Sequence, residues 1–221
     1  FFCIKCNYCI IMIKGFSHRL YQLLTIELLG VVAHRVMAPV TRPLKAFDLT
    51  DYPDAKVAAV MILLYPKQDT VYLALIKRPD YGGVHSGQVS FPGGKSEDSD
   101  TDYQFTALRE TEEEIGVKAS LIQVIGQLSN VYIPPSNFFV FPFVGLLDHS
   151  PQFLPDVNEV EYIIEVPVNL LLDPAIKSTV KINRPEVSFD APCYLINGHT
   201  VWGATAIILS EFEFLLKQMD I

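Results

Sequence analysis

Apolar residues along the chain fall into runs with the length and composition of β-strands. KVAAVMILLY (56–65) and VYLALIKR (71–78) are rich in strand-forming residues, and the short turn between them predicts a hairpin. Three more such runs, separated by turn residues, cover residues 120–129, 138–147 and 159–168. In APCYLINGHTVW, Asn197-Gly198 predicts a second hairpin, because this dipeptide suits a tight two-residue turn.

Other segments show the spacing of amphipathic helices. Leucines at 20, 23, 24 and 28 predict an N-terminal helix over about 14–36, followed by a proline-containing linker to residue 54. Thr101–Ile115 is the best helix candidate, with Gly116 in the position favoured after a helix. We also expect a short helix at VNLLLDP (168–174) and an amphipathic helix from Ala204 to Gln218.

Residues 79–100 contain five glycines and two prolines and predict a loop before the Thr101–Ile115 helix. Asp100, Thr101 and Asp102 are all candidates to cap that helix. Strands interrupted by helices in this order predict an α/β fold, a mixed sheet flanked by helices. The length of 221 residues fits one domain over 51–221 with an N-terminal extension over 1–50.

The composition narrows the classes of partner. Half of the residues are hydrophobic, as in a globular protein, and the net charge of -8 argues against a general nucleic-acid-binding face. No apolar run is long enough to cross a membrane, and polar Gln22, Thr25 and Glu27 disfavour a signal peptide over residues 20–33. The cysteines suggest no disulfide framework, so we expect a cytoplasmic protein. Whether it forms a homodimer stays open.

Three cysteines near the start have the C-x2-C-x2-C spacing of iron–sulfur ligands: Cys3, Cys6 and Cys9. The run lacks a fourth cysteine nearby, and it precedes Met12, a natural start. We therefore do not predict a cluster, and whether residues 1–11 are native stays open.

The stretch RETEEEIG (109–116) crowds glutamates onto one predicted helix. At 3.6 residues per turn, Glu110 and Glu114 are one turn apart and Glu113 lies beside them, whereas Glu112 points elsewhere. Arg109 is one turn before Glu113 and is placed to hold it. Converging carboxylates repel one another unless a proton or a cation neutralises them, and Mg²⁺ or Mn²⁺ suits oxygen ligands. The alternative is a solvated acidic face.

The upstream loop strengthens the metal interpretation. GGKSEDSDTDYQFTALRETEEEIGV closely resembles the Nudix box, whose second half is matched position by position by Arg109, Glu110, Glu113, Glu114, Gly116 and Val117. The resemblance implies a Nudix-type α/β/α sandwich and a divalent-metal-dependent pyrophosphohydrolase. It further implies metal ligands at Glu110, Glu114 and Glu113, with a carbonyl from Gly93 or Gly94, and an orienting role for Arg109.

One irregularity concerns the loop before the helix. Fourteen residues separate Gly94 from Arg109, where the family has thirteen, so the family's first glutamate falls on Asp100 or on Thr101. The resemblance leaves the general base open between Glu113 and Glu159. Glu159 precedes a predicted strand, where many Nudix enzymes place a late carboxylate.

The segment ALIKRPDYGGVHSGQVSFPGG resembles the signature of the coenzyme A pyrophosphatase branch of the Nudix family. The likeness implies hydrolysis of coenzyme A to 3',5'-ADP and 4'-phosphopantetheine. Gly83 replaces an arginine of that signature, which keeps other substrates open: ADP-ribose, NADH or a modified nucleotide. A catalytically inert Nudix-like regulator is the alternative of another class. Candidate substrate contacts are Arg78, His85 and Lys95, which are basic, and Tyr132 in a proline-rich loop.

Overall fold

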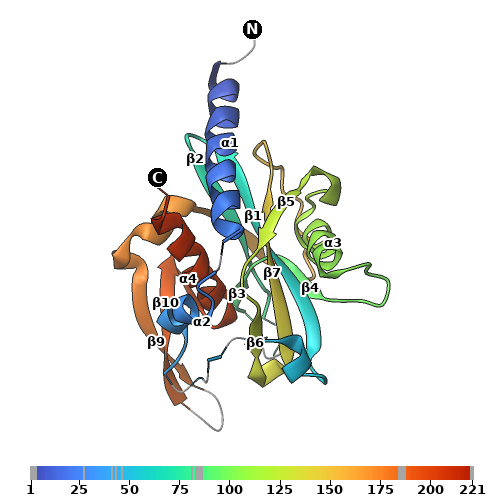
Figure 1. Cartoon of the computed structure of the whole chain (residues 1–221), viewed down its shortest axis with the longest axis vertical. Coiled ribbons are helices and arrows are strands. Elements are labelled where there is room, and N and C mark those ends of the chain that lie inside the picture. Colours follow the sequence, from blue (N-terminus) through green and yellow to red (C-terminus); the bar gives the residue numbers. More distant parts are fainter. Residues whose placement is uncertain are drawn as a thin grey trace.

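The computed structural model describes residues 4–26, 28–40, 42, 44–45, 47–80, 82, 87–183 and 188–219, with side chains from Ile13 onward. Figure 1 shows a central sheet with one helix on one side and the remaining helices on the other. The predicted α/β architecture with a mixed sheet and an N-terminal helix is confirmed. No helix in the described part of the chain is both long and apolar enough to span a bilayer.

The central sheet is built around its longest strand, β1. Strands β3-β2-β1-β7-β5 lie in this order, with β4 paired to β1, β6 to β7 and β8 to β2. The β1–β7 pair is parallel and the other pairs are antiparallel, so the sheet is mixed. The strands are β1 (Lys56–Lys67), β2 (Thr70–Lys77), β3 (Val89–Ser90), β4 (Gly93–Lys95), β5 (Gln123–Gln127), β6 (Val131–Ile133), β7 (Phe138–Leu146) and β8 (Tyr162–Pro167).

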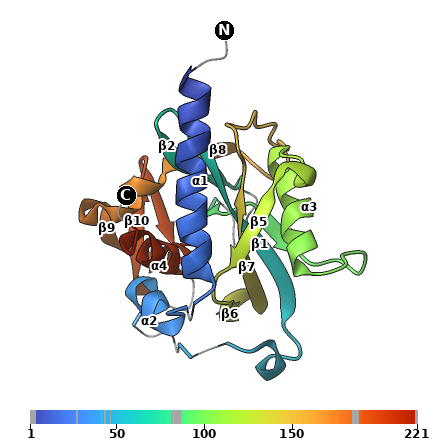
Figure 2. The ribbon, with the colours of Figure 1, turned by 45° about the horizontal axis from the view of Figure 1, so that its top comes forward.

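Alternate residues of β1 face two different hydrophobic layers. Ala59 and Met61 pack in the layer beneath helix α3 (Tyr103–Ile115), together with Ala107 and Ile115 of that helix. Ile62 and Leu64 face the opposite layer, which contains helix α4 (Ala204–Lys217) and the end of helix α1 (Ile4–Leu24). Figure 2 shows α1 and α4 over one side of the sheet and α3 at the other.

A second, three-stranded sheet packs beside α4. It consists of β9 (Lys177–Asn183), β10 (Ser188–Ile196) and β11 (His199–Trp202) in the order β11-β10-β9. Its β10–β11 hairpin turns at Asn197 and Gly198, which both have positive φ angles of 49° and 81°. The hairpin predicted at Asn197-Gly198 is therefore confirmed.

The N-terminal helix differs from its predicted range of about 14–36. Helix α1 ends at Leu24, and a separate short helix, α2, covers Val31–His34. Gly30 precedes α2 with φ 48°, a left-handed conformation that interrupts a helix. The predicted apolar face is present, because Leu20 and Leu23 are buried in the core.

Helix α4 was predicted to be amphipathic, but it is buried on nearly all sides. Its acidic residues are accommodated by partners inside the protein. Glu211 accepts hydrogen bonds from the backbone amides of Gly30 and Ser129, at 2.7 and 2.8 Å. Glu213 accepts from the Tyr194 hydroxyl at 2.6 Å and lies 2.6 Å from the Lys177 ammonium. The hydrophobic pattern did not reveal these partners because they lie far away in the sequence.

Four strands were not predicted, and three of them are only two or three residues long. Residues 79–100, predicted as a loop, contain β3 and β4, and β6 and β9 also lie outside the apolar runs. Strand β4 includes two glycines, and it forms because Gly93 and Gly94 pair with Val60 and Ala59 of β1. Short strands of this kind depend on a neighbouring strand and carry little pattern of their own.

Candidate functional site: a carboxylate cluster beside a cavity

Helix α3 is held in place at both ends. Of the three candidate caps, Asp102 is the one that acts, since its side chain accepts a hydrogen bond from the Phe105 amide at 2.7 Å. Gly116 ends the helix in the left-handed conformation, with φ 72°, and its amide donates to the Glu112 carbonyl. These ends fix the rotation of the helix and hence the direction of its glutamates.

Three carboxylates converge at the sheet edge beside α3. Glu110, Glu114 and Glu159 each offer one oxygen within 4.8 Å of the others, in an arrangement that could hold a metal ion. Glu159 comes from the loop before β8, and this loop is tied to α3 because the Asp156 amide donates to the Glu114 carbonyl at 3.0 Å. The structure thus brings together two predicted ligands and the late carboxylate.

Burial makes Glu114 the most perturbed member of the cluster. Its side chain is 1% exposed and accepts hydrogen bonds from the Gly93 amide at 2.8 Å and from Arg78 at 3.3 Å. Burial raises the pKa of Glu114 to about 8, although both contacts oppose that rise. Burial also raises the pKa of Glu110. A cation would relieve both costs.

The other glutamates of the helix lie outside the cluster. Glu113 is 59% exposed and pairs with Arg109 at 2.8 Å, and Glu112 is exposed and accepts from the Ala119 amide. Glu112 therefore points away, as predicted. Glu113 is rotated about 60° from Glu110 around the helix, which directs it toward Arg109 and solvent.

Arg109 is fixed by the lengthened loop. Asp100, whose side chain is fully buried, accepts from the Nε and Nη2 atoms of Arg109 at 2.9 and 3.0 Å. Arg109 also donates to Glu110 at 2.9 Å and to the Lys95 carbonyl at 3.1 Å. The hydrogen bonds from Arg109 hold the pKa of Asp100 well below its usual range. Asp100 therefore keeps a carboxylate in this loop, and that carboxylate positions Arg109.

The two glycines of β4 lie where larger residues would not fit. A Cβ atom on Gly94 would lie 2.3 Å from a carboxylate oxygen of Glu110. One on Gly93 would lie 2.4 Å from the Ala59 carbonyl oxygen, and Gly93 has a φ of 146°. Both glycines therefore allow the strand to approach its neighbours closely.

A cavity of about 600 Å³ lies on the other face of the sheet and reaches this edge. Gly93, Gly94, Lys95 and Arg78 line it, so Arg78 contacts both the cavity and Glu114. Its remaining wall is mainly apolar and includes Ile133, Pro134, Pro135, Phe138, Val140, Phe189, Trp202 and Ile208. A ligand in this cavity can therefore extend around the edge strand to the carboxylates.

Three polar atoms in the wall have no hydrogen-bond partner among the described residues: Nε of Arg42, Nε of Arg78 and Oγ of Ser90. Buried donors without partners are uncommon in folded proteins and indicate a place for a polar ligand group or water. The sequence did not single out Ser90, because an isolated serine in a loop carries no signal.

The predicted substrate contacts fall in different places. Arg78 and Lys95 line the cavity. Tyr132 faces the opposite side of β6 from Ile133, and its ring stacks on Tyr52 with centroids 3.9 Å apart. Its hydroxyl donates to Asn137. His85 lies outside the described residues, as does Gly83. Trp202 also lines the cavity.

Comparison with known proteins decides the family. The NUDIX domain matches residues 55–184, more than half of the chain. The chain belongs to the Nudix hydrolase family. A relative named "Uncharacterized Nudix hydrolase NudL", from Yersinia pestis (strain Pestoides F), is 30% identical over 202 residues, which cover 90% of this chain and 99% of the relative. A NudL from Yersinia pseudotuberculosis serotype O:1b matches equally well.

The solved structures support the same fold. The crystal structure of RenU, a Nudix hydrolase from M. Smegmatis, superposes with a TM-score of 0.52 at 13% identity. The match covers 76% of this chain and 89% of RenU. At this identity the likeness concerns the fold of the Nudix hydrolase and not its substrate.

The donor set of this Nudix hydrolase fits a hard divalent cation. Three carboxylates share one point, two of them carry raised pKa values, and oxygen ligands of this kind are preferred by Mg²⁺ and Mn²⁺. Nudix hydrolases generally use divalent metals, and among the described residues the acidic cluster is a place that could hold one.

The pKa of Glu114 predicts how stability depends on pH. Because its folded-state pKa of about 8 exceeds the usual 4.5, the metal-free folded protein binds more protons than the unfolded chain between these values. Stability of the metal-free protein should therefore fall as pH rises from about 5 to 8, and Mg²⁺ should raise the melting temperature more at pH 8 than at pH 5.5.

Thermal unfolding with chelator and with Mg²⁺ at both pH values measures this effect, expected to be on the order of 5 °C. Glu114→Gln, which cannot ionise, is the matched control and should show a much smaller dependence. An equal effect of Mg²⁺ at both pH values would contradict the assignment.

Proposed function

We propose that this Nudix hydrolase cleaves the diphosphate of coenzyme A or its derivatives, with Mg²⁺ or Mn²⁺, to 3',5'-ADP and 4'-phosphopantetheine. The observation that carries the proposal is the cavity: it is large, mainly apolar and joined to the carboxylate cluster through Arg78. Such a site suits a substrate with a diphosphate in its middle and long groups on both sides. HSGQVSFPGG is typical of this branch, and its described part, residues 87–94, contributes Gln88, Ser90, Phe91, Gly93 and Gly94 to the cavity wall.

Glu110 and Glu114 would hold the metal, and Glu159 lies close to both of them. When bound, the ion neutralises charge on phosphate oxygens and makes a coordinated water more acidic. Arg109 keeps Glu110 in place, and Asp100 in turn keeps Arg109 in place. The glutamates are therefore oriented before substrate arrives.

The diphosphate would lie beside β4, where basic side chains meet the carboxylates. Arg78 already contacts Glu114 and has a free Nε, and Lys95 lines the same wall. Both side chains can donate charge-assisted hydrogen bonds to phosphate oxygens. Ser90 offers a hydroxyl without a partner among the described residues.

The attacking water needs a base that is close to the cluster and not already paired. Glu159 is exposed and lies within 4.8 Å of Glu110 and Glu114, whereas Glu113 is bonded to Arg109. We therefore assign the base to Glu159. It takes a proton as water adds to one phosphorus, and the bond from that phosphorus to the bridging oxygen breaks. Each product keeps one phosphate of the former diphosphate, and the nucleotide product also keeps its 3'-phosphate.

A second candidate is a Nudix hydrolase for ADP-ribose, NADH or a modified nucleotide. Gly83, in place of the branch's arginine, favours it. The inert-regulator alternative is disfavoured by the intact group of three carboxylates.

A substrate panel with product identification tests the proposal. Coenzyme A, ADP-ribose and NADH are each incubated with the protein and Mg²⁺, and products are identified by mass spectrometry. We expect the highest kcat/KM for coenzyme A, with 3',5'-ADP and 4'-phosphopantetheine as products. Turnover of coenzyme A no better than that of the other two substrates would overturn the substrate assignment.

A further inference from the structure

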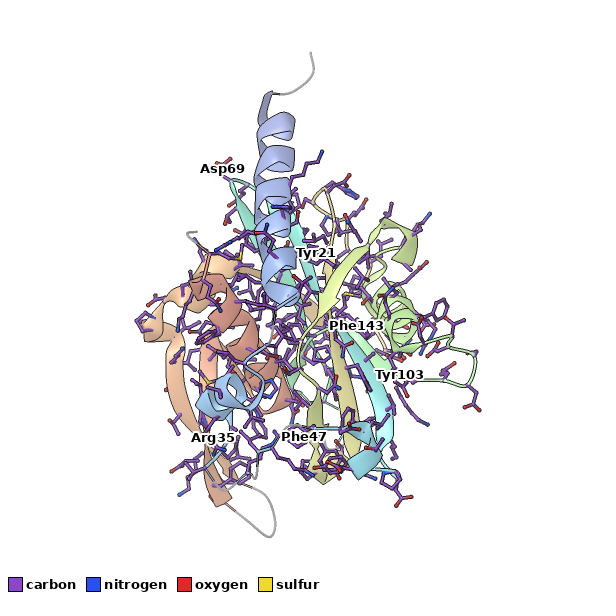
Figure 3. The ribbon with its side chains drawn as sticks, viewed as in Figure 1. Tyr21, Arg35, Phe47, Asp69, Tyr103 and Phe143 are labelled. Carbon is purple, nitrogen blue, oxygen red and sulfur yellow. The ribbon has the colours of Figure 1, made fainter. Side chains whose placement is uncertain are left out.

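The N-terminal extension contributes a cationic side chain to the cavity. Arg42 belongs to the linker between α2 and β1, and it lines the cavity together with Pro39. One of its terminal nitrogens donates to the Tyr132 carbonyl of β6. Phe47 of this linker, labelled in the lower part of Figure 3, packs against Tyr132 of β6, with ring centroids 6.3 Å apart.

Arg42 has no counter-charge in the described structure. None of the described residues that line the cavity is acidic, and no described carboxylate pairs with Arg42. Its Nε atom is buried without a hydrogen-bond partner among the described residues. Burial lowers the pKa of Arg42 below its ordinary value, so its charge is held at a cost.

Arg42 and Lys95 line different ends of the cavity, and Lys95 lines the end that is nearer to the carboxylate cluster. Tyr132 pairs with Phe139, which pairs with Val57, and the next residue of β1, Ala58, pairs with Lys95. Three inter-strand steps of about 4.8 Å therefore separate Tyr132 from Lys95, roughly 15 Å in all. A single diphosphate cannot contact both ends, but a larger substrate with a second anionic group can.

We infer that Arg42 binds a second anionic group of the substrate, a phosphate monoester on its nucleotide half, separate from the diphosphate that is cleaved. The guanidinium fork suits a phosphate, because it can donate two parallel hydrogen bonds to it. The inference rests on the proposed function, since the 3'-phosphate of coenzyme A is such a group. It makes the N-terminal extension a determinant of specificity.

Ligand binding tests this inference without requiring turnover. Calorimetry compares 3',5'-ADP with 5'-AMP, which differ by one phosphate monoester, in the wild type and in Arg42→Gln. The wild type should bind 3',5'-ADP about tenfold or more tighter, and the variant should lose most of that difference. Arg35→Gln is the matched control: Arg35 is exposed in the same extension and lies at the periphery of the molecule in Figure 3.

The outcomes separate a binding role from a structural one. If Arg42 acts only by holding the Tyr132 carbonyl, the variant should weaken both ligands equally, which would overturn the inference. So would an absent preference in the wild type, or a preference that survives in Arg42→Gln. Arg42→Lys keeps the charge without the fork and should restore part of the preference.

The two proposals can fail separately. If the wild type does not hydrolyse coenzyme A but Arg42→Gln still loses the preference for 3',5'-ADP, then the phosphate subsite stands and the substrate assignment falls. If coenzyme A is hydrolysed and the preference is unchanged in Arg42→Gln, then only the subsite is refuted.

Discussion

Glu114→Gln should lower kcat by about a thousandfold or more while the protein stays folded. The variant removes the charge from the most buried carboxylate of the cluster, whose side chain is 1% exposed. The amide has nearly the same shape, and its oxygen can still accept from the Gly93 amide, so the local packing survives. Steady-state kinetics with coenzyme A and Mg²⁺ measure kcat, and circular dichroism shows whether the variant is folded.

Glu112→Gln is the matched control for that experiment. Glu112 is on the same helix, but it is exposed and bonded to the Ala119 amide, away from the cluster. Its activity should stay within about twofold of the wild type. Full activity in Glu114→Gln would show that the metal-site assignment is wrong.

Asp100→Asn should destabilise the protein by about 3 kcal/mol and also lower activity. The Asp100 side chain is buried and accepts two hydrogen bonds from Arg109, and the amide can accept only on one side. Arg109 then loses its main partner while it remains only 16% exposed, and Glu110 loses its support. Urea unfolding measures the loss of stability, and steady-state kinetics measure the loss of activity.

Asp98→Asn serves as the control because Asp98 is exposed in the same loop. The metal dependence of the rate separates two roles of Asp100. If Asp100 positions Arg109, Asp100→Asn should lower stability even in the presence of chelator. It should also lower kcat even at saturating metal. If stability in chelator is unchanged and only the metal requirement rises, Asp100 is a ligand instead.

Local signals in the sequence predicted much of this site. The glycine after α3, the acidic cap and the apolar spacing determine where the helix lies and how it is rotated. The pairing of Glu110 with Glu114 follows from a helical repeat, and it is found in the structure. Such features depend on neighbouring residues, so a sequence pattern contains them.

Contacts between distant segments could not be predicted in the same way. Helical spacing placed Glu113 beside the cluster, but its bond with Arg109 draws it away, while Glu159 arrives from a loop 45 residues later in the chain. Tyr132 was expected in the pocket, yet the alternation of β6 turns Ile133 to that side. Arg42 had no local motif, because only the path of the linker brings it to the cavity.

We propose that Glu110 and Glu114, and not Glu113, hold the divalent ion. Calorimetric titration of the protein with Mn²⁺, without substrate, tests it most directly. Mn²⁺ should bind at least about tenfold more weakly to Glu110→Gln and to Glu114→Gln than to the wild type, and within about twofold of the wild type to Glu113→Gln. Equal weakening in Glu113→Gln and Glu114→Gln, or wild-type affinity in Glu114→Gln, would contradict it.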